Sequence, residues 1–199
     1  MKRAFDVALA SIGLAISAPL WCVLAIAIKL EDGGPVFYAQ DRVGRDGRLF
    51  RALKFRSMQC DAERTTGPLQ ARHGDARITR AGRVMRATAM DELPQLWNIL
   101  RGDMSFVGPR ALRPGEIEFE GETPVPLEAV PGYADRIVVR PGLTGIAQVY
   151  ASRDISRRSK FRYDRLYIRR RSFALDMRLI LLSFWISFRG TWESRDRKY

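Results

Sequence analysis

The sequence predicts a helix-rich α/β domain, closer to the α+β type, that associates with a membrane through an N-terminal apolar helix. Three observations support this class: an uncharged run of 22 residues from Val7 to Ile28, a hairpin signal at Asp46-Gly47, and leucines at helical spacing after residue 91. With 199 residues, 46% of them hydrophobic, the chain can form one core plus an appendage. We therefore expect a membrane segment at residues 1–32 and a membrane-associated domain at residues 33–199, with a small hairpin or sheet and amphipathic surface helices.

The N-terminal apolar run is long enough to cross a bilayer as a straight helix, because ~20 residues at ~1.5 Å each span the ~30 Å hydrocarbon core. Pro19 lies near its middle, where it removes a backbone donor and disfavours helical geometry at Ala18. Basic residues lie on both sides of the run, and the positive-inside rule then places both ends in the cytoplasm. These residues are Lys2, Arg3, Lys29, Arg42, Arg45, Arg48 and Arg51. A re-entrant helix broken at Pro19 and a proline-kinked span both remain open on the residues alone.

A β-hairpin is predicted directly after the membrane segment. Val36 to Gln40 is a short apolar strand candidate, and Leu49 to Phe55 is the second strand. Asp46-Gly47 between them has the composition of a two-residue hairpin turn. The second strand leads into Lys54-Phe55-Arg56-Ser57-Met58, in which two cations flank an aromatic residue. Lys54 and Arg56 are therefore either phosphate contacts or the solvated end of a strand.

Two adjacent carboxylates, Asp91 and Glu92, open the next predicted helix, which runs to Leu100. Its apolar residues follow the spacing of one buried face: Leu93, Leu96, Trp97 and Leu100. Asp91 would then be the N-cap, but a weak one, since the third helical residue is Pro94 and has no N–H to donate. Part of the Asp91 carboxylate should thus face outward. A plain helix cap followed by a first-turn acid is the alternative.

The segments before this helix supply cations. The stretch from Thr65 to Arg77 mixes Gly, Pro, Thr and charged residues without a period, so we expect a mobile loop. A short helix from Ala81 to Ala87 should carry Arg83 and Arg86 toward the carboxylate pair.

The C-terminal half alternates tight turns with short regular elements. Gly102-Asp103 should end the acidic helix, and an extended segment then enters the rigid turn Gly108-Pro109-Arg110. Residues 113–132 should form an irregular surface excursion with at most a short helix, since they are rich in Pro, Gly and Glu. Ile137 to Val139 reads as a strand. In Arg140-Pro141-Gly142-Leu143-Thr144-Gly145, the two glycines permit close approach to a ligand or to a neighbouring strand.

The last part of the chain is predicted to be extended at first and then helical. Ile146 to Tyr150 should continue extended, and helices should follow at Ser159 to Tyr167 and Phe173 to Phe188. Aromatic residues lie among arginines in the last helix and after it, which is typical of a helix at a membrane surface. A helix packed in the core is the competing interpretation.

The composition limits the partners and the catalytic mechanisms that can be expected of this chain. A formal net charge of +12 indicates an anionic partner, which could be nucleic acid, an acidic membrane or a phosphorylated substrate. The two cysteines, Cys22 and Cys60, have no metal-ligand spacing, and His73 is the one histidine of the sequence. Mechanisms that need a catalytic cysteine or histidine are thereby disfavoured, so an acid, base or nucleophile should be a carboxylate.

Five segments in this order resemble the bacterial sugar transferases, which are small monotopic phosphoglycosyl transferases. They are the apolar helix with its central proline, Lys54-Phe55-Arg56-Ser57-Met58, Asp91-Glu92-Leu93-Pro94-Gln95, Gly108-Pro109-Arg110 and Arg140-Pro141-Gly142-Leu143-Thr144-Gly145. The match covers nearly the whole chain. The sequence departs from the family at Ala111 and Ala18, where proline and serine are usual, and neither change removes a reacting group.

This resemblance implies an activity and its site. The expected reaction moves a phosphosugar from a UDP-sugar to polyprenyl phosphate, with Mg²⁺, at the cytoplasmic face of the bacterial inner membrane. Asp91 would attack the β-phosphorus to form a covalent intermediate, and Glu92 would help hold the metal. The resemblance also implies that the membrane helix is re-entrant. Membrane lipid is an expected partner, and a homo-oligomer is compatible with the sequence.

The residues fit these roles. Arg86 and Arg110 have guanidinium groups that can bind phosphate oxygens at two points. Lys54 and Arg56 are further candidates for phosphate binding. Candidate nucleotide or loop contacts are Arg140, Gly142 and Thr144. Mg²⁺ prefers oxygen ligands and often uses one or two carboxylates together with substrate phosphates. The sugar is not specified, and neither is the role of the Glu-rich residues from Gly115 to Glu128.

A membrane-tethered nucleic-acid-binding protein is the alternative from another class, since the chain has 34 Lys and Arg residues. We do not expect nucleic acid to be the partner, because the arginines are scattered over strands and loops without a recognised reading module or interleaved stacking aromatics. A non-catalytic scaffold for glycan assembly is a third possibility, against which the intact Asp91 and Glu92 argue.

Overall fold

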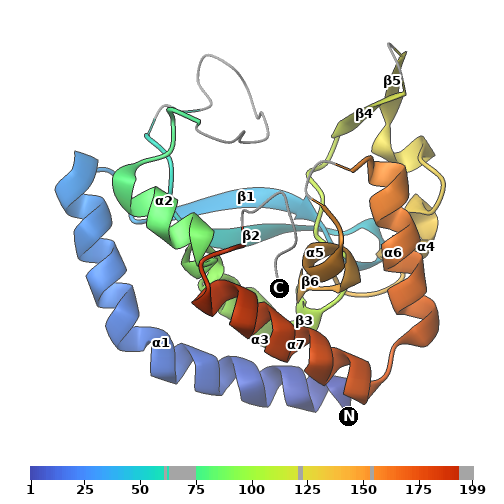
Figure 1. Cartoon of the computed structure of the whole chain (residues 1–199), viewed down its shortest axis with the longest axis horizontal. Coiled ribbons are helices and arrows are strands. Elements are labelled where there is room, and N and C mark those ends of the chain that lie inside the picture. Colours follow the sequence, from blue (N-terminus) through green and yellow to red (C-terminus); the bar gives the residue numbers. More distant parts are fainter. Residues whose placement is uncertain (61, 63–74, 121–122, 153–154, 193–199) are drawn as a thin grey trace.

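The computed structural model describes residues 1–60, 62, 75–120, 123–152 and 155–192. Figure 1 shows helices surrounding a central hairpin, with the long helix α1 (Lys2–Asp32) running along one edge of the molecule. In these described residues the strands form three separate two-stranded sheets. The predicted class, a helix-rich mixture of helices with small sheets, is confirmed. The loop predicted from Thr65 lies outside the described residues as far as residue 74.

Helix α1 is continuous through Pro19 and bends instead of ending there (Figure 1). A proline removes one backbone hydrogen bond and crowds the preceding turn, which accounts for a bend. Around it, Trp21 Nε1 donates to Ser17 Oγ (3.0 Å), and Ser17 Oγ donates to the Leu14 carbonyl (3.5 Å). By length and composition α1 could cross a membrane, and most of its apolar stretch is not buried against the rest of the protein.

Both ends of α1 are bonded to the rest of the domain. At the N-terminal end, Arg3 donates to the carbonyls of Ile99 (2.5 Å) and Leu100 (2.7 Å). The buried Asp6 accepts hydrogen bonds from Ser105 Oγ and from the backbone N–H of Phe106, both at 3.1 Å. These contacts fix the first turns of α1 to the segment from helix α3 (Gln95–Arg101) to strand β3 (Ser105–Val107).

The C-terminal end of α1 is held by two carboxylates. Glu31 accepts hydrogen bonds from the backbone N–H groups of Arg80 and Ala81 (the latter at 3.0 Å) in the first turn of helix α2 (Arg80–Ala87). Asp32 forms a two-point ion pair with the buried guanidinium of Arg56. The two ends of the helix therefore contact the same domain.

Strands β1 (Phe37–Val43) and β2 (Leu49–Phe55) form the predicted antiparallel hairpin, with Val43 opposite Leu49. The turn is a 3-10 turn at Arg45–Gly47 in which Asp46 and Gly47 both have positive φ, at 56° and 76°. This is the conformation that an Asp-Gly pair favours in a two-residue hairpin. The predicted turn is confirmed, and β1 extends three residues beyond the predicted strand.

Strand β3 pairs in parallel with β6 (Gly142–Thr144), so the extended segment predicted before Gly108 is confirmed. A Cβ on Gly142 would collide with the backbone nitrogen of Gly108. Of the two uses proposed for the glycines near residue 142, the structure therefore shows the close approach of a neighbouring strand.

Three predicted segments are wrong. Ile137 to Val139 is not a strand, because helix α4 (Tyr133–Ile137) occupies its start. Residues 146–150 are not extended but form helix α5 (Ile146–Tyr150). Short apolar or β-branched runs fit a buried strand and a buried helical turn equally well, so periodicity could not separate the two.

The third error is in residues 113–132, which are more regular than predicted. They contain a second hairpin, β4 (Ile117–Glu120) and β5 (Thr123–Pro126), followed by a 3-10 turn at Leu127–Ala129. The two prolines of β5, paired at the edge of an isolated hairpin, hid this strand from a pattern search.

Helices α6 (Arg157–Arg170) and α7 (Phe173–Phe188) close the fold and confirm the two predicted C-terminal helices. Leu179 and Ile186 of α7 are fully buried in the largest core cluster. Other apolar residues of the same helix are exposed: Leu181, Phe184, Trp185 and Phe188. The buried face confirms packing of this helix in the core, and its position at a membrane surface stays a prediction.

Candidate active site

The carboxylate pair lies in a 3-10 turn, Met90–Glu92, between α2 and α3. Asp91 is not a helix cap: α3 begins at Gln95, and its N-cap residue is Pro94. Nor does its carboxylate face outward, since Asp91 and Glu92 are each only 6% exposed. The turn begins at Ala89, which has a positive φ of 58°. That conformation is uncommon for a residue with a side chain and is often found at functional sites.

Helix α3 also packs differently from its predicted face. Trp97 is 47% exposed, while Leu96, Asn98 and Ile99 are buried. The Asn98 side chain donates from Nδ2 to the Arg51 carbonyl (2.8 Å), and its Oδ1 accepts from the N–H of Leu53 (3.0 Å). Asn98 therefore bonds α3 to β2 next to Lys54. Asn98 was not among the residues predicted for the site, although an Asn among the apolar positions of a predicted helix was a signal.

Two cations contact the acid pair directly. Lys54 Nζ lies 2.5 Å from Glu92 Oε1 and 3.7 Å from Asp91 Oδ2. Arg110 Nη2 lies 2.9 Å from the same Glu92 oxygen. Arg86 of α2 is close enough that its charge lowers the pKa of Asp91. The structure thus brings together five predicted site residues from four segments of the chain.

The pKa values of the two carboxyls are shifted in opposite directions. Burial raises the pKa of Asp91, and the negative charge of Glu92 adds to this, although Lys54 opposes it. Burial alone would also raise the pKa of Glu92, but the charges and hydrogen bonds of Arg110 and Lys54 outweigh it and lower that pKa. Glu92 is therefore the firmly ionised partner. Divergent titration of neighbouring acids is common at catalytic sites.

The backbone carbonyls of Arg110 and of the two residues after it each accept a hydrogen bond from another part of the chain. Arg136 Nη2 donates to the Arg110 carbonyl (2.6 Å), and Arg42 Nη1 donates to the Ala111 carbonyl (3.0 Å). The backbone N–H of Val43 donates to the Leu112 carbonyl (2.8 Å). This turn is thereby fixed against both α4 and β1.

Arg136 is itself buried. Its Nε lies 3.1 Å from Asp164 Oδ2, and its guanidinium lies over the ring of Phe161 at 4.6 Å from the centroid. Arg42, Arg136 and Asp164 were not predicted as site residues, because partners so far apart in the chain leave no local pattern in the sequence.

The remaining predicted site residues have intramolecular partners. Arg56 donates to Asp32, to the Pro35 carbonyl (2.6 Å) and to Cys60 Sγ (2.8 Å). Arg140 Nε donates to the Gly102 carbonyl (2.8 Å), and Thr144 Oγ1 bonds to Ser183 Oγ. These hydrogen bonds connect parts of the fold to one another, and none of them is made to Asp91 or Glu92.

A family model described as bacterial sugar transferase matches residues 1–190. The chain belongs to this family.

Curated relatives of this transferase carry related names. It is 42% identical over 187 residues to the UDP-glucose:undecaprenyl-phosphate glucose-1-phosphate transferase of Caulobacter vibrioides, covering 90% of this chain and 67% of that protein. It is 39% identical over 189 residues to the exopolysaccharide production protein PSS of Rhizobium leguminosarum bv. phaseoli, covering 90% and 91%. It is 41% identical over 184 residues to an Aeromonas hydrophila UDP-N-acetylgalactosamine-undecaprenyl-phosphate N-acetylgalactosaminephosphotransferase, of which it spans only 42%.

The acid pair, Asp91 and Glu92, is the candidate source of carboxylate oxygens for a metal ion. No group of three or more His, Cys, Asp or Glu side chains that could hold a metal occurs in the part of the chain that the structure describes. Both cation contacts of Glu92 end on Oε1, which leaves lone pairs on Oε2. One or two carboxylates completed by phosphate oxygens suit Mg²⁺. The donor set therefore fits a metal that arrives with a phosphorylated substrate.

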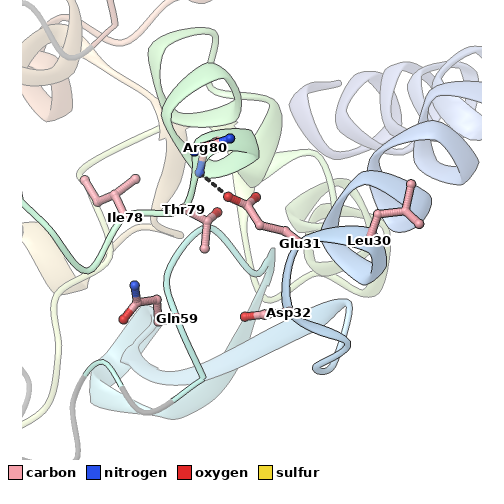
Figure 2. A pocket seen from close by; sticks show the side chains of 7 residues that line it. All are labelled: Leu30, Glu31, Asp32, Gln59, Ile78, Thr79 and Arg80. Carbon is pink, nitrogen blue, oxygen red and sulfur yellow. Dashed lines mark hydrogen bonds between the residues drawn. The ribbon is translucent and has the colours of Figure 1, made fainter.

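A pocket of about 500 Å³ lies elsewhere, at the C-terminal end of α1 (Figure 2). Figure 2 shows Glu31 pointing to the backbone of Arg80, with Asp32 and Gln59 below them in the view. Its lining includes neither carboxylate of the acid pair. This pocket is therefore separate from the candidate active site.

Proposed function

We propose that this transferase is a phosphoglycosyl transferase that moves a phosphosugar from a UDP-sugar to polyprenyl (undecaprenyl) phosphate. The products are a polyprenyl-diphosphate-sugar and UMP, in a first membrane step of glycoconjugate or exopolysaccharide assembly. The observation that carries this proposal is the buried acid pair with Lys54 and Arg110 on Glu92. The printed names of relatives at about 40% identity support the substrate classes.

In the first step, Asp91 is the nucleophile. A carboxylate oxygen of Asp91 attacks the β-phosphorus, the bond from that phosphorus to the bridging oxygen breaks, and UMP leaves with the electron pair. An oxygen of polyprenyl phosphate then attacks the phosphorus of the adduct, and the Asp91 carboxylate is released. Lys54 and Arg110 provide positive charge where the phosphoryl oxygens accumulate negative charge. No separate base is required, because neither attacking group has to lose a proton when ionised.

Glu92 would help hold Mg²⁺ beside the diphosphate of the donor. When bound, the ion shields the diphosphate from the carboxylates and stabilises the departing UMP. Glu92 suits this role because its lowered pKa keeps it ionised.

The rate should depend on pH through Asp91. Because burial raises its pKa, the neutral form persists to a higher pH than for an ordinary carboxyl near ~3.9, and the nucleophile is lost as pH falls through this raised value. Glu92, with a lowered pKa, should add no limb of its own in this range. The pH profile of kcat/KM for the UDP-sugar measures this. An acidic midpoint at or below ~3.9 would contradict the assignment.

We also propose that α1 is re-entrant and that the protein is monotopic on the cytoplasmic face of the bacterial inner membrane. The support is that Arg3 and Asp6 at one end of α1, and Glu31 and Asp32 at the other, bond to the same domain. A helix crossing the bilayer once would separate these ends by the ~30 Å hydrocarbon core. The basic residues at both ends agree with this orientation.

Cysteine labelling tests this topology. In a background with Cys22 and Cys60 replaced by serine, single cysteines at Lys2 and Lys29 should both react from the cytoplasmic side alone. A cysteine at the exposed Arg48 of the hairpin marks the side of the domain. Pro19→Leu should straighten the helix and favour spanning, since it restores the missing backbone donor. Labelling of Lys2→Cys from the periplasm would show a true span.

The activity itself is tested with a panel of UDP-sugars, undecaprenyl phosphate and Mg²⁺, with UMP release as the measurement. One sugar should be turned over with formation of a lipid-linked product. Tight nucleic-acid binding with a steep salt dependence, and no turnover of any UDP-sugar, would favour the nucleic-acid alternative instead.

A further inference from the structure

Asn98 of α3 pairs with the edge of strand β2 that β1 leaves unpaired. Among the described residues β2 pairs with β1 alone, and an edge strand presents backbone N–H and C=O groups that need partners. Asn98 Oδ1 accepts from the N–H of Leu53 (3.0 Å), and Nδ2 donates to the carbonyl of Arg51 (2.8 Å). A side-chain amide offers the same donor and acceptor as a peptide group. One side chain therefore takes the place of a third strand at this edge.

The amide of Asn98 has one orientation that satisfies all of its neighbours. Its second N–H donates to Asp103 Oδ2 (3.1 Å), and the residue is only 2% exposed. If the amide were turned over, its oxygen would face the Arg51 carbonyl and the Asp103 carboxylate, and its N–H groups would face the N–H of Leu53. Buried donors and acceptors would then lose their partners, which is costly. The amide therefore holds β2 against α3 in one register.

The segment of β2 that Asn98 holds leads directly to Lys54, the residue after Leu53. The Lys54 ammonium lies 2.5 Å from Glu92 Oε1, although the two residues are 38 positions apart in the chain. Helix α3 begins at Gln95, shortly after the acid pair. A lysine has a flexible four-carbon stem, so the position of its ammonium depends on how firmly its backbone is held. Asn98 thus links the helix that follows the acid pair to the strand that carries the cation.

We propose that Asn98 is a positioning residue, whose amide at the edge of β2 holds Lys54 against the acid pair. The side-chain hydrogen bonds of Asn98 go to β2 and to Asp103, so it acts through Lys54 and does not contact the carboxylates of the pair. The inference rests on the proposed function for the reaction that Lys54 serves, whereas the placement of Lys54 can be measured without any substrate.

Apolar packing keeps this region folded when the amide is removed. Phe55 at the end of β2 belongs to a buried apolar cluster, and Met90 and Leu93 from the acid-pair turn and its end pack against that cluster. These contacts do not involve Asn98. Its loss should therefore loosen the hold on Lys54 without unfolding the domain.

Chemical modification of lysines measures the placement of Lys54 directly. The detergent-solubilised full chain is treated briefly with acetic anhydride, and peptide mass spectrometry gives the acetylation rate at each lysine. In Asn98→Ala the rate at Lys54 should rise by about tenfold, because its ammonium is released from the charged hydrogen bond to Glu92. Lys29 is an exposed lysine that donates to the Gly33 carbonyl (3.1 Å), and its rate should stay the same.

Ser105→Ala is the matched control variant. It removes another buried side-chain hydrogen bond, from Ser105 Oγ to Asp6 (3.1 Å), and leaves β2 untouched, so the rate at Lys54 should not change. Asn98→Asp is a second test if Asn98→Ala does not fold. It keeps the size and the acceptor but places an oxygen against the Arg51 carbonyl, and it should also raise the rate at Lys54. An unchanged rate in the folded Asn98 variant, or an equal rise in Ser105→Ala, would overturn the inference.

A double-mutant cycle tests the link to catalysis. Asn98→Ala should lower kcat for UDP-sugar turnover by about tenfold in the wild-type background. In Lys54→Met, which keeps the stem but lacks the charge, the same substitution should lower kcat by less than about twofold, because the group that Asn98 positions is already absent. An equal factor in both backgrounds would show that Asn98 acts independently of Lys54, and would overturn the inference.

Failure of the proposed function gives a different result. Wild-type protein would then turn over no UDP-sugar, yet the acetylation rate at Lys54 would still rise in Asn98→Ala and not in Ser105→Ala. That rise by itself would uphold the role of Asn98 in placing Lys54, and its absence would refute that role.

Discussion

Asp91→Asn should abolish the phosphosugar adduct and lower turnover by about a thousandfold or more. Asparagine keeps the size of the side chain but is not a nucleophile toward phosphorus. The protein should remain folded. Since the folded state raises the pKa of Asp91, its ionised form costs stability above the unfolded pKa, and removing that charge should leave Tm unchanged or higher. Intact-mass spectrometry after incubation with the UDP-sugar, with UMP release in parallel, measures the effect.

Asp135→Asn is the matched control. This carboxylate lies on α4, pairs with Arg165 at 2.9 Å and is about half exposed. It should change neither adduct nor turnover. Turnover near the wild-type level in Asp91→Asn would show that another acid is the nucleophile.

Glu92→Gln should lower turnover by about a hundredfold and raise the Mg²⁺ concentration needed for half-maximal rate. A neutral amide is a poorer ligand for Mg²⁺ than a carboxylate, and it leaves Lys54 and Arg110 without their shared anion. It should also destabilise the fold by about 2 kcal/mol, less than for a fully buried pair, because the Arg110 side chain is 44% exposed.

The sign of this stability change follows from titration. Glu92 has a lowered pKa in the folded state, so its contribution is present above the unfolded pKa and is lost as pH falls through the folded value. The difference in Tm between wild type and Glu92→Gln should therefore be present at neutral pH and shrink in acid. Glu128→Gln, an exposed acid in the 3-10 turn at Leu127–Ala129, is the control. An unchanged Mg²⁺ requirement in Glu92→Gln would place the metal on other ligands.

Local chemistry predicted much of the fold. The Asp46-Gly47 turn, the short helix at α2 and the two C-terminal helices each follow from signals within a few residues, so the sequence was sufficient for them. Helix α5 was missed because five apolar and polar residues cannot show a period. The 3-10 turn at Asp91 was missed because capping rules assume that the helix starts at the acid, whereas α3 starts at Gln95.

Some residues of the candidate site could also be predicted from the sequence, and others could not. Lys54, Arg86 and Arg110 were identified as cations for the acid pair, and the structure brings them to it. Arg56 was grouped with them, yet its donors go to Asp32 and to neighbouring atoms. Sequence gives the charge of an arginine but not its partner, because the partner can be any acid that folding brings near. For this reason the sequence could not show that Arg42 and Arg136 hold the turn at Arg110.

The covalent step is the centre of the proposed mechanism, and one measurement tests it directly. Wild-type protein is incubated with its UDP-sugar and Mg²⁺ in the absence of polyprenyl phosphate, and both intact mass and released UMP are recorded. We expect a mass increase equal to one phosphosugar, UMP released in an amount equal to the protein, and discharge of the adduct when polyprenyl phosphate is added. Continuous turnover with the acceptor present, and no adduct or UMP without it for any sugar, would contradict the covalent mechanism and favour direct attack by the lipid phosphate.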